Sequence, residues 1–434
     1  MGRRVLIVAS TYAPAMMADM HRARLLAWEL PALGWDVEVL CPDATYQVAA
    51  SVDADSGGFF CPDTPIHYVG QAYGEFFRLV RMRSIGWRAL AAMNGVAAQL
   101  FAQRHFDMVY FSTTQFSLFL LGPLWRRRYG VPYALDFHDP CYRDEPGFHG
   151  GVQPGIRRWV GRRLSKAVEA TATSSAAGLV SVSPRYIETL RDRYGAKHPS
   201  WLRHGCNAVI PFAGSGRDLE EAARTLRPCG DLRHAKSRIV YAGAGGPIME
   251  RAFGVLCRGL AELKRRKCAL LDRVEIVLYG TMLHWREGDR RHLHEVAKSN
   301  GVETLVREEP GRVSYRRSLE LLLGAQGALV LGVEDAGYVP SKLVTYALSG
   351  KPLLTVLNAR SPARALLRDM SDSTHSVWFG DDEPGAQETA AVVERYLEQV
   401  VSGASYDRLS LLASGLAREM AVRHAGLFEQ CMTT

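Results

Sequence analysis

The chain has 434 residues, of which 47% are hydrophobic and 23% charged, and its formal net charge is +8. Its length exceeds what one ordinary hydrophobic core organises, so two or three domains are expected. The composition excludes a long disordered tract. The modest positive charge suits acidic partners such as nucleotide phosphates or anionic lipid and does not require nucleic acid.

Three features bear on where the protein works. Eight cysteines are scattered without a Cys-x-x-Cys pair, which fits a reducing, cytoplasmic setting. No run approaches the roughly 20 apolar residues of a membrane-spanning helix. Arg3 and Arg4 precede an apolar run that is too short for a signal peptide and that we interpret as a strand.

The first half of the chain alternates short apolar strands with amphipathic helices. A helix is expected over 19–33, with Gly34 ending it. The expected strands are 5–9, 36–40, 108–111, 133–136 and 179–182. This alternation is typical of a parallel sheet with helices on both faces.

The pattern lapses over 208–236 and then resumes. The later strands are expected at 238–242, 274–279, 328–332 and 352–357, with helices at 252–265 and 341–348. We therefore predict an α/β protein with a linking region between two similar domains and a helical C-terminus that could brace the first domain. The predicted divisions are 1–207, 208–236, 237–386 and 387–434.

The strongest local signal for binding runs from Gly337 to Pro352. A strand ends in a glycine-containing loop, and a helix is expected to begin at Pro340 or Ser341. Lys342 adds a positive charge beside the free N–H groups of that helix, at the strand end where open α/β sheets bind ligands. This pattern indicates a phosphate site. The alternative is an ordinary capped helix with a solvated lysine.

A second candidate follows the strand at 133–136. The stretch 136–144 contains a His, three Asp, a Tyr and an Arg. His138 could contact a sugar hydroxyl or shuttle a proton near neutral pH, and Asp139 could accept a proton from an acceptor hydroxyl. The structural alternatives are that Asp139 caps the turn before Pro140 and that His138 is a hydrogen-bonded loop residue.

Two further loops follow predicted strands. The loop after the first strand lacks Gly-x-Gly-x-x-Gly. Its His21, Arg22 and Arg24 could meet a phosphate or an acceptor, or could be solvated. In the second half, Gly243 would let the backbone approach a ligand closely, or it simply forms a flexible turn. His284, His292 and His294 lack a metal-binding spacing, so no metal is expected.

Arginines gather near aromatic residues in three places. These clusters are Arg78, Arg81, Arg83 and Arg88; Arg126 to Arg128; and Arg157, Arg158, Arg162 and Arg163 around Trp159. Such helices either lie on anionic lipid or present a solvated basic face. No nucleic-acid-binding motif accompanies them, so no nucleic-acid partner is expected.

Several motifs together resemble a known family. They are the Tyr12-x-Pro14 turn, 33–39, His138–Asp139, 177–186, 204–207, 239–243 and 340–352. In order and spacing they resemble the family-four group of GT-B glycosyltransferases, particularly the bacterial polysaccharide-type members, over nearly the whole chain.

The resemblance implies two Rossmann-like, doubly wound domains facing across a cleft. It implies a hexosyltransferase that uses a nucleotide diphosphate sugar as substrate, retains anomeric configuration and needs no metal or cofactor. The acceptor could be a sugar, a lipid-linked molecule or a small molecule. The residue roles are as follows: Ser341, Lys342, Gly243 and Arg251 for the donor phosphates; Glu334, Asp335, Gly337 and Thr345 for the donor sugar or ribose; His138 and Asp139 for catalysis; His21 and Arg24 for the acceptor.

Two departures from the family pattern concern the donor. Thr345 stands where the group usually has a Glu that binds the ribose hydroxyls, and Thr cannot take two hydroxyls bidentately. The Arg and Lys expected after the first strand of the second domain are missing, with Arg251 as the nearest substitute. A GT-B-shaped sugar-nucleotide epimerase and a catalytically silent scaffold subunit are therefore the alternatives to a transferase.

Overall fold

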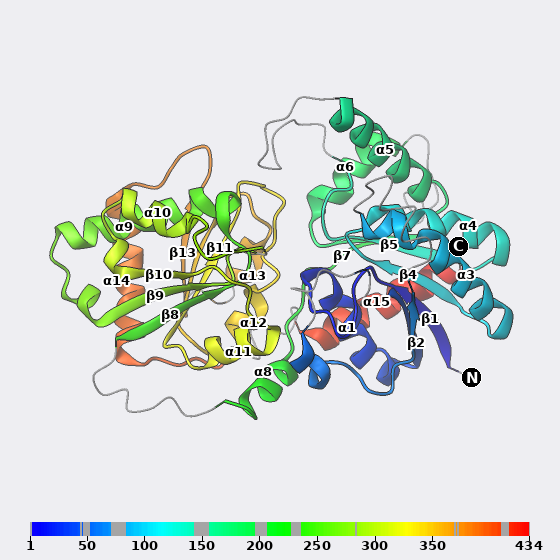
Figure 1. Ribbon diagram of the computed structural model, residues 1–434, viewed down its shortest axis with the longest axis horizontal. Coiled ribbons are helices and arrows are strands. Elements are labelled where there is room, and N and C mark those ends of the chain that lie inside the picture. The colour runs from blue at the N-terminus through cyan, green and yellow to red at the C-terminus, as the bar shows by residue number, and fades with distance from the viewer. Residues whose placement is uncertain are drawn as a thin grey trace. The chain divides into compact units, whose positions relative to one another are not determined.

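In the computed structural model the chain folds into two compact units (Figure 1). Unit 1 is Met1–Pro211 with Ala417–Thr434, and unit 2 is Phe212–Leu416. The structure describes residues 2–43, 46, 53–70, 84–142, 156–195, 206–226, 236–282, 284–368, 370, 373–408 and 416–433. Arg78, Arg81 and Arg83 of the first arginine cluster lie outside these ranges, as do the ends of the stretches 136–144 and 204–207 and the side chains of Arg157 and Arg158.

Unit 1 is built on a seven-stranded sheet in the order β3-β2-β1-β4-β5-β6-β7, and all its paired strands are parallel. The strands are β1 Arg3–Val8, β2 Trp35–Pro42, β3 Ile66–Val69, β4 Met108–Ser112, β5 Tyr133–Phe137, β6 Gly178–Ser181 and β7 Asn207–Val209. The α-helices are α1 His21–Glu29, α3 Ile85–Gln103, α4 Leu121–Tyr129, α5 Ile156–Thr173, α6 Pro184–Tyr194 and α15 Ala417–Met432.

Helices on both faces explain the continuous apolar runs of these strands. Every residue of β4 and β5 is buried. The helix expected over 19–33 is shorter in the structure, because α1 ends at Glu29 and a 3-10 turn follows over Pro31–Leu33. Gly34 ends this turn in a left-handed conformation with φ 82°.

Unit 2 is built on a six-stranded parallel sheet in the order β10-β9-β8-β11-β12-β13. The strands are β8 Ser237–Ala242, β9 Val274–Tyr279, β10 Val306–Glu309, β11 Gly327–Leu331, β12 Leu353–Asn358 and β13 Thr374–Phe379. The α-helices are α8 Gly216–Ala223, α9 Glu250–Arg265, α10 His292–Ser299, α11 Tyr315–Leu323, α12 Leu343–Leu348, α13 Ala363–Arg368 and α14 Ala386–Ser402. This is the strand order of doubly wound nucleotide-binding folds.

Part of the expected linking region belongs to unit 2. Helix α8 packs on α11, where the Tyr315 hydroxyl donates to Asp218 at 2.7 Å and Arg316 pairs with Glu221 at 2.8 Å.

The two C-terminal helices belong to different units, because α14 packs on α9 of unit 2 whereas α15 packs on α1 and β5 of unit 1. None of the described helices combines the length and apolarity that crossing a membrane requires.

Helix α15 contributes to the core of unit 1 through a buried face. The Phe428 ring lies 5.4 Å from Trp35 and 5.2 Å from Tyr110, and Met420 and His424 are buried on the same helix. The terminal helix therefore helps to form the core of a sheet whose strands lie hundreds of residues earlier.

We expect Phe428→Ala to lower the free energy of unfolding by about 3–5 kcal/mol, because it leaves a cavity between Trp35 and Tyr110. The matched control is Val422→Ala, which changes an exposed residue of the same helix and should shift stability by less than about 0.5 kcal/mol. Denaturant unfolding measures both. Equal midpoints for the two variants would contradict the placement of α15.

Candidate active site

In unit 2 the predicted phosphate residues Gly243 and Lys342 lie against each other. Gly243 directly follows β8 and has φ +148°, and a Cβ atom added there would lie 1.8 Å from Lys342 Nζ. The lysine ammonium therefore occupies the space that any side chain at position 243 would fill. Only glycine fits this backbone conformation and this close approach.

Lys342 is a desolvated cation. Burial lowers its pKa to about 8, and its Nζ lies 5.1 Å from the ring centroid of Tyr241. Among the described residues, no carboxylate lies within salt-bridge distance of it. A desolvated ammonium without a carboxylate is poised to bind an anion, because an anion would restore the lost electrostatic stabilisation.

Tyr346, which follows Lys342 by one helical turn, fixes the position of the lysine. Its hydroxyl accepts from the Ala242 amide at 2.9 Å and donates to the Ala242 carbonyl at 3.1 Å. Both bonds are buried and join α12 to the end of β8. The tyrosine thus sets the register between the helix that carries the lysine and the strand that precedes Gly243.

The start of α12 differs from the prediction. The helix begins at Leu343 rather than at Pro340 or Ser341, and no side chain caps it. The Leu343 amide bonds to the Pro340 carbonyl at 3.2 Å, so a turn over 340–343 precedes the helix. Helix α12 has only six residues, so the positive charge at this place comes from Lys342 more than from a helix dipole.

Thr345, at the expected ribose position, is packed rather than open. It is 9% exposed, and a Cβ added at Gly214 would lie 3.0 Å from its backbone nitrogen. Asp335 and Gly337 form one turn, in which Asp335 Oδ1 accepts from the Gly337 amide at 2.8 Å. These two residues shape the loop after β11.

Arg251 and Glu334 lie together at a second place in unit 2. Arg251 Nη1 is 3.7 Å from Glu334, its Nε is 2.7 Å from Glu383, and its guanidinium lies over the Phe379 ring. Arg251 is therefore neutralised by carboxylates, in contrast to Lys342. Its expected contact with phosphate would require exchange of these partners.

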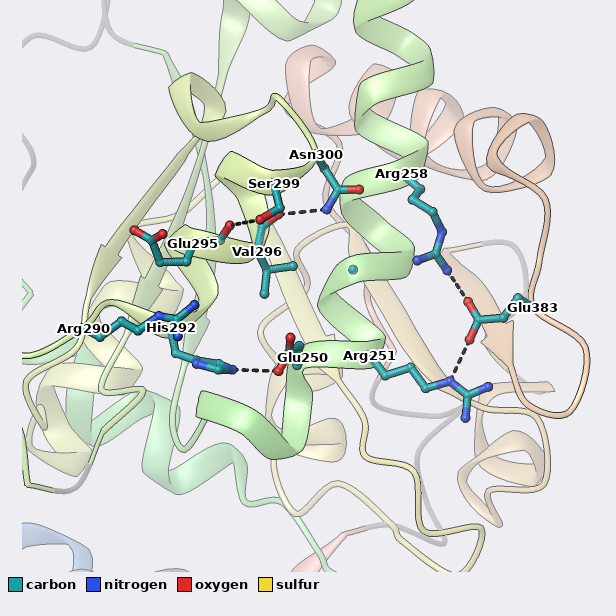
Figure 2. A pocket seen from close by; sticks show the side chains of 11 residues that line it. Glu250, Arg251, Arg258, Arg290, His292, Glu295, Val296, Ser299, Asn300 and Glu383 are labelled. Carbon is teal, nitrogen blue, oxygen red and sulfur yellow. Dashed lines mark hydrogen bonds and ion pairs between the residues drawn. The ribbon is translucent and has the colours of Figure 1, made fainter. Parts of the chain in front are cut away.

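A cavity of about 600 Å³ opens beside Arg251 between α9 and α10 (Figure 2). Its charged side chains are largely paired: His292 lies 2.9 Å from Glu250, and Arg258 as well as Arg251 contacts Glu383. Arg290, which also lines the cavity, is exposed to solvent, so the described part of the cavity lacks a desolvated cation like the one beside Gly243.

In unit 1, His138 is buried against a carboxylate. Its Nε2 lies 2.5 Å from Asp136 Oδ2, the same oxygen that pairs with Arg22 Nε at 2.9 Å. Burial alone would raise the pKa of Asp136, but the Arg22 guanidinium and the His138 ring lower it well below its usual range. Asp139, the next residue after His138, is exposed.

The structure places His21 and Arg24 together on α1. Arg24 Nη2 lies 3.3 Å from His21 Nδ1, and Arg24 Nη1 donates to the Phe59 carbonyl at 2.8 Å. Arg24 is fully buried, whereas His21 is half-buried. The expected contact of Arg24 with an acceptor would therefore require its guanidinium to leave the core of unit 1.

Sequence reasoning missed several residues that organise these sites: Asp136, Tyr110, His424, Tyr241 and Tyr346. The role of Asp136 could have been predicted from the sequence, because an aspartate in a buried strand two residues before His138 needs a partner. The others stand in apolar or helical stretches without a local signal. Within the described ranges, no group of three or more His, Cys, Asp or Glu residues is arranged to hold a metal ion.

The two parallel sheets are those of a GT-B fold with two Rossmann-like domains. Residues 21–201, which lie within unit 1, match the glycosyl transferase 4-like domain. This confirms the family-four resemblance. No curated protein sequence matches the chain significantly.

Solved structures match the chain over its full length. The trehalose-6-phosphate phosphatase N-terminal domain of Candida albicans has a TM-score of 0.63 at 12% identity, with 99% of this chain and 97% of that chain covered. HepE of Anabaena in complex with UDP-glucose has a TM-score of 0.58 at 13% identity, covering 98% and 99%. The α,α-trehalose 6-phosphate synthase of Burkholderia multivorans has a TM-score of 0.59 at 12% identity, covering 99% and 97%. At these identities the likeness establishes the fold alone.

We expect Gly243→Ala to displace the Lys342 ammonium, because the new Cβ and Nζ cannot share one space. The pKa of Lys342 should rise from about 8 toward its ordinary value, and stability should fall by about 1–3 kcal/mol from the strained φ. NMR titration of reductively ¹³C-methylated protein, with Lys342→Met assigning the signal, measures the pKa. The control is Gly216→Ala, since Gly216 has open space around it. An unchanged pKa in Gly243→Ala would contradict the contact.

Proposed function

We propose that the protein is a glycosyltransferase that moves a hexose from a nucleotide diphosphate sugar to an acceptor hydroxyl. The observation that carries the proposal is the desolvated Lys342 ammonium held beside Gly243, at the carboxyl end of β8 in a doubly wound sheet. Diphosphates bind at this end of such sheets. Lys342 and the adjacent Ser341 are the residues we assign to the diphosphate.

The proposed reaction breaks the bond between the sugar anomeric carbon and the diphosphate oxygen and forms a bond to the acceptor oxygen. Negative charge develops on the departing diphosphate, where Lys342 would stabilise it. The acceptor hydroxyl loses a proton, for which the exposed Asp139 carboxylate is the candidate base. His138 is the candidate contact for the donor sugar.

The family resemblance supports the finer points of the proposal. Retention of anomeric configuration and independence of metal ions are carried over from the family-four group. HepE, which shares the fold, has been solved with UDP-glucose, and a uridine diphosphate donor is therefore the first to test. Glu334, Asp335, Gly337 and Thr345 remain the candidates for the donor sugar or ribose.

The acceptor is proposed to be a sugar, a lipid-linked molecule or a small molecule, with His21 on the acceptor side. We also propose that the protein contacts an anionic membrane peripherally from the cytoplasmic side. The support is that α5 exposes Trp159 beside Arg162 and Arg163. Arg163 lies 4.5 Å from the Trp159 ring centroid. This pairing of cation and aromatic ring is common at membrane interfaces.

A catalytically silent scaffold is the second candidate, because Thr345 is both shorter than the family's Glu and packed near Gly214. A sugar-nucleotide epimerase is the third. Thr345→Glu should leave a scaffold inactive. An epimerase should convert the donor sugar without an acceptor, which product analysis by NMR would detect.

We expect Lys342→Met to weaken binding of uridine diphosphate by about 10- to 100-fold, the loss typical of a charge-assisted contact. Wild-type affinity should fall as the pH rises through about 8, because deprotonation removes the cation. Isothermal titration calorimetry measures both effects. The control is Lys351→Met, which alters the half-buried lysine just after α12.

A panel of nucleotide sugars with and without candidate acceptors then tests transfer, and ¹H NMR of the product reports its anomeric configuration. Binding equal to wild type in Lys342→Met, or no binding of any nucleotide diphosphate, would refute the proposed function.

A further inference from the structure

Four polar groups converge on one oxygen of Asp136 in the core of unit 1. Asp136 Oδ2 lies 2.5 Å from His138 Nε2, 2.8 Å from the Tyr110 hydroxyl, 2.9 Å from Arg22 Nε and 3.5 Å from Ser112 Oγ. These side chains come from α1, β4 and the end of β5, and all of them are buried. The arrangement is a built polar network, not a surface ion pair.

The chemistry of these groups determines where the protons lie. An ionised carboxylate can only accept hydrogen bonds. His138 must therefore donate to Asp136, Tyr110 can donate to it, and Arg22 pairs with it as a cation, so the proton of a neutral His138 ring must reside on Nε2. The Nδ1 atom of that ring is then an acceptor, which can receive a hydrogen bond from a hydroxyl but cannot donate one.

Helix α15 reaches the same network through His424. His424 Nδ1 lies 2.7 Å from the Met420 carbonyl, which only accepts, so Nδ1 carries a proton. Burial and then Arg22 lower the pKa of His424 to about 3, so the ring is neutral near pH 7 and its Nε2 is an acceptor. That atom lies 2.9 Å from the Tyr110 hydroxyl oxygen. The single hydrogen of the Tyr110 hydroxyl can serve only one of these two acceptors at a time, Asp136 or His424.

We propose that Asp136 is a positioning residue that holds His138 as its Nε2–H tautomer, and that Arg22 and the His424–Tyr110 contact hold Asp136 in turn. The proposal rests on the proposed function, because it assigns His138 its role in transfer. His138 acts toward the donor sugar as a hydrogen-bond acceptor through Nδ1. The terminal helix is thereby part of the site, although it lies 314 residues from Tyr110 in the chain.

The charged and titratable groups around His138 come from every element packed against it. They are Asp136 on β5, Arg22 on α1, Tyr110 on β4, His424 on α15, and the neighbouring Asp139. Arg22 and Asp136 neutralise each other, and burial together with Asp136 keeps Tyr110 protonated by raising its pKa well above 10. The Asp136 carboxylate is therefore the charged group that His138 contacts directly.

The first test reads the tautomer directly and needs no activity. Long-range ¹H–¹⁵N spectra of ¹⁵N-histidine-labelled protein, assigned by comparison with His138→Gln, should show that the neutral form of the His138 ring carries its proton on Nε2 and not on Nδ1. The opposite tautomer would overturn the proposal. Tyr110→Phe should shift the His424 signals and leave those of the exposed His105 unchanged.

The second test separates positioning from folding. Asp136→Asn alone leaves Arg22 buried without its partner, so it is compared with the double variant Arg22→Gln/Asp136→Asn, which removes both charges. In the folded double variant we expect a mixed His138 tautomer and a kcat lowered by about 100-fold or more, with nucleotide diphosphate affinity unchanged. The control is Asp107→Asn, which alters the exposed His105–Asp107 pair at 3.3 Å and should retain wild-type kcat.

A wild-type kcat in the folded double variant would overturn the positioning role. Failure of the proposed function is recognised separately, as the absence of nucleotide diphosphate binding in the wild-type protein, and the tautomer spectra decide the Asp136–His138 pairing in that case as well.

Discussion

The ion pair between Arg22 and Asp136 is the constraint on which unit 1 depends. Both side chains are fully excluded from water, and removing two charges from water costs several kcal/mol for each ion. Such a pair adds little stability relative to apolar residues of the same size, whereas the loss of one partner costs about 3–5 kcal/mol. The pair is therefore better explained by what it holds in place. It orders α1, β4 and β5 around one carboxylate oxygen, and the loop carrying His138 and Asp139 leaves from that point.

The two units treat buried charge in opposite ways. In unit 1 the two buried arginines of α1 both have partners: Arg22 has Asp136, and Arg24 has the Phe59 carbonyl. In unit 2 the Arg251 charge is balanced by Glu334 and Glu383, but Lys342 is desolvated against Gly243 without a carboxylate among the described residues. An uncompensated cation destabilises the free protein, and its lowered pKa records that cost. A bound diphosphate would offset the cost of desolvating the Lys342 ammonium. Among the described residues, Lys342 is therefore the cation that an anionic ligand would stabilise most.

Features of the fold and site that depend on local sequence could be predicted, whereas contacts between residues far apart in the chain could not. The inner strands of both sheets could be predicted, because a parallel sheet covered on both faces requires short apolar runs between helices. The edge strands β3, β7, β10 and β13 were not expected, since each is partly exposed or half-buried and carries no continuous apolar run. The importance of Gly243 and Lys342 could be predicted one at a time from their places after strands, but not their contact across 99 residues of chain. His138 was identified by the same reasoning, whereas His424 was not, because a histidine in an amphipathic helix carries no local sign of a partner 314 residues away. Arg22 and Arg24 resembled solvated residues, since only tertiary packing shows that both are buried.

The short α12 changes the physical basis of the phosphate site. A helix of six residues whose first amide already bonds to the Pro340 carbonyl has little dipole to offer an anion. The attraction must come from the Lys342 charge and from the backbone approach that Gly243 permits. Tyr346 then becomes as important as the lysine itself, because its two bonds to Ala242 keep the helix and the strand in register. A ribose grip at Thr345 would need an open side chain on that same helix, and the packing near Gly214 leaves little room for one. In the proposed site, selectivity for the nucleotide would therefore come from groups outside α12, and the contact with phosphate would come from Lys342, which directly precedes α12.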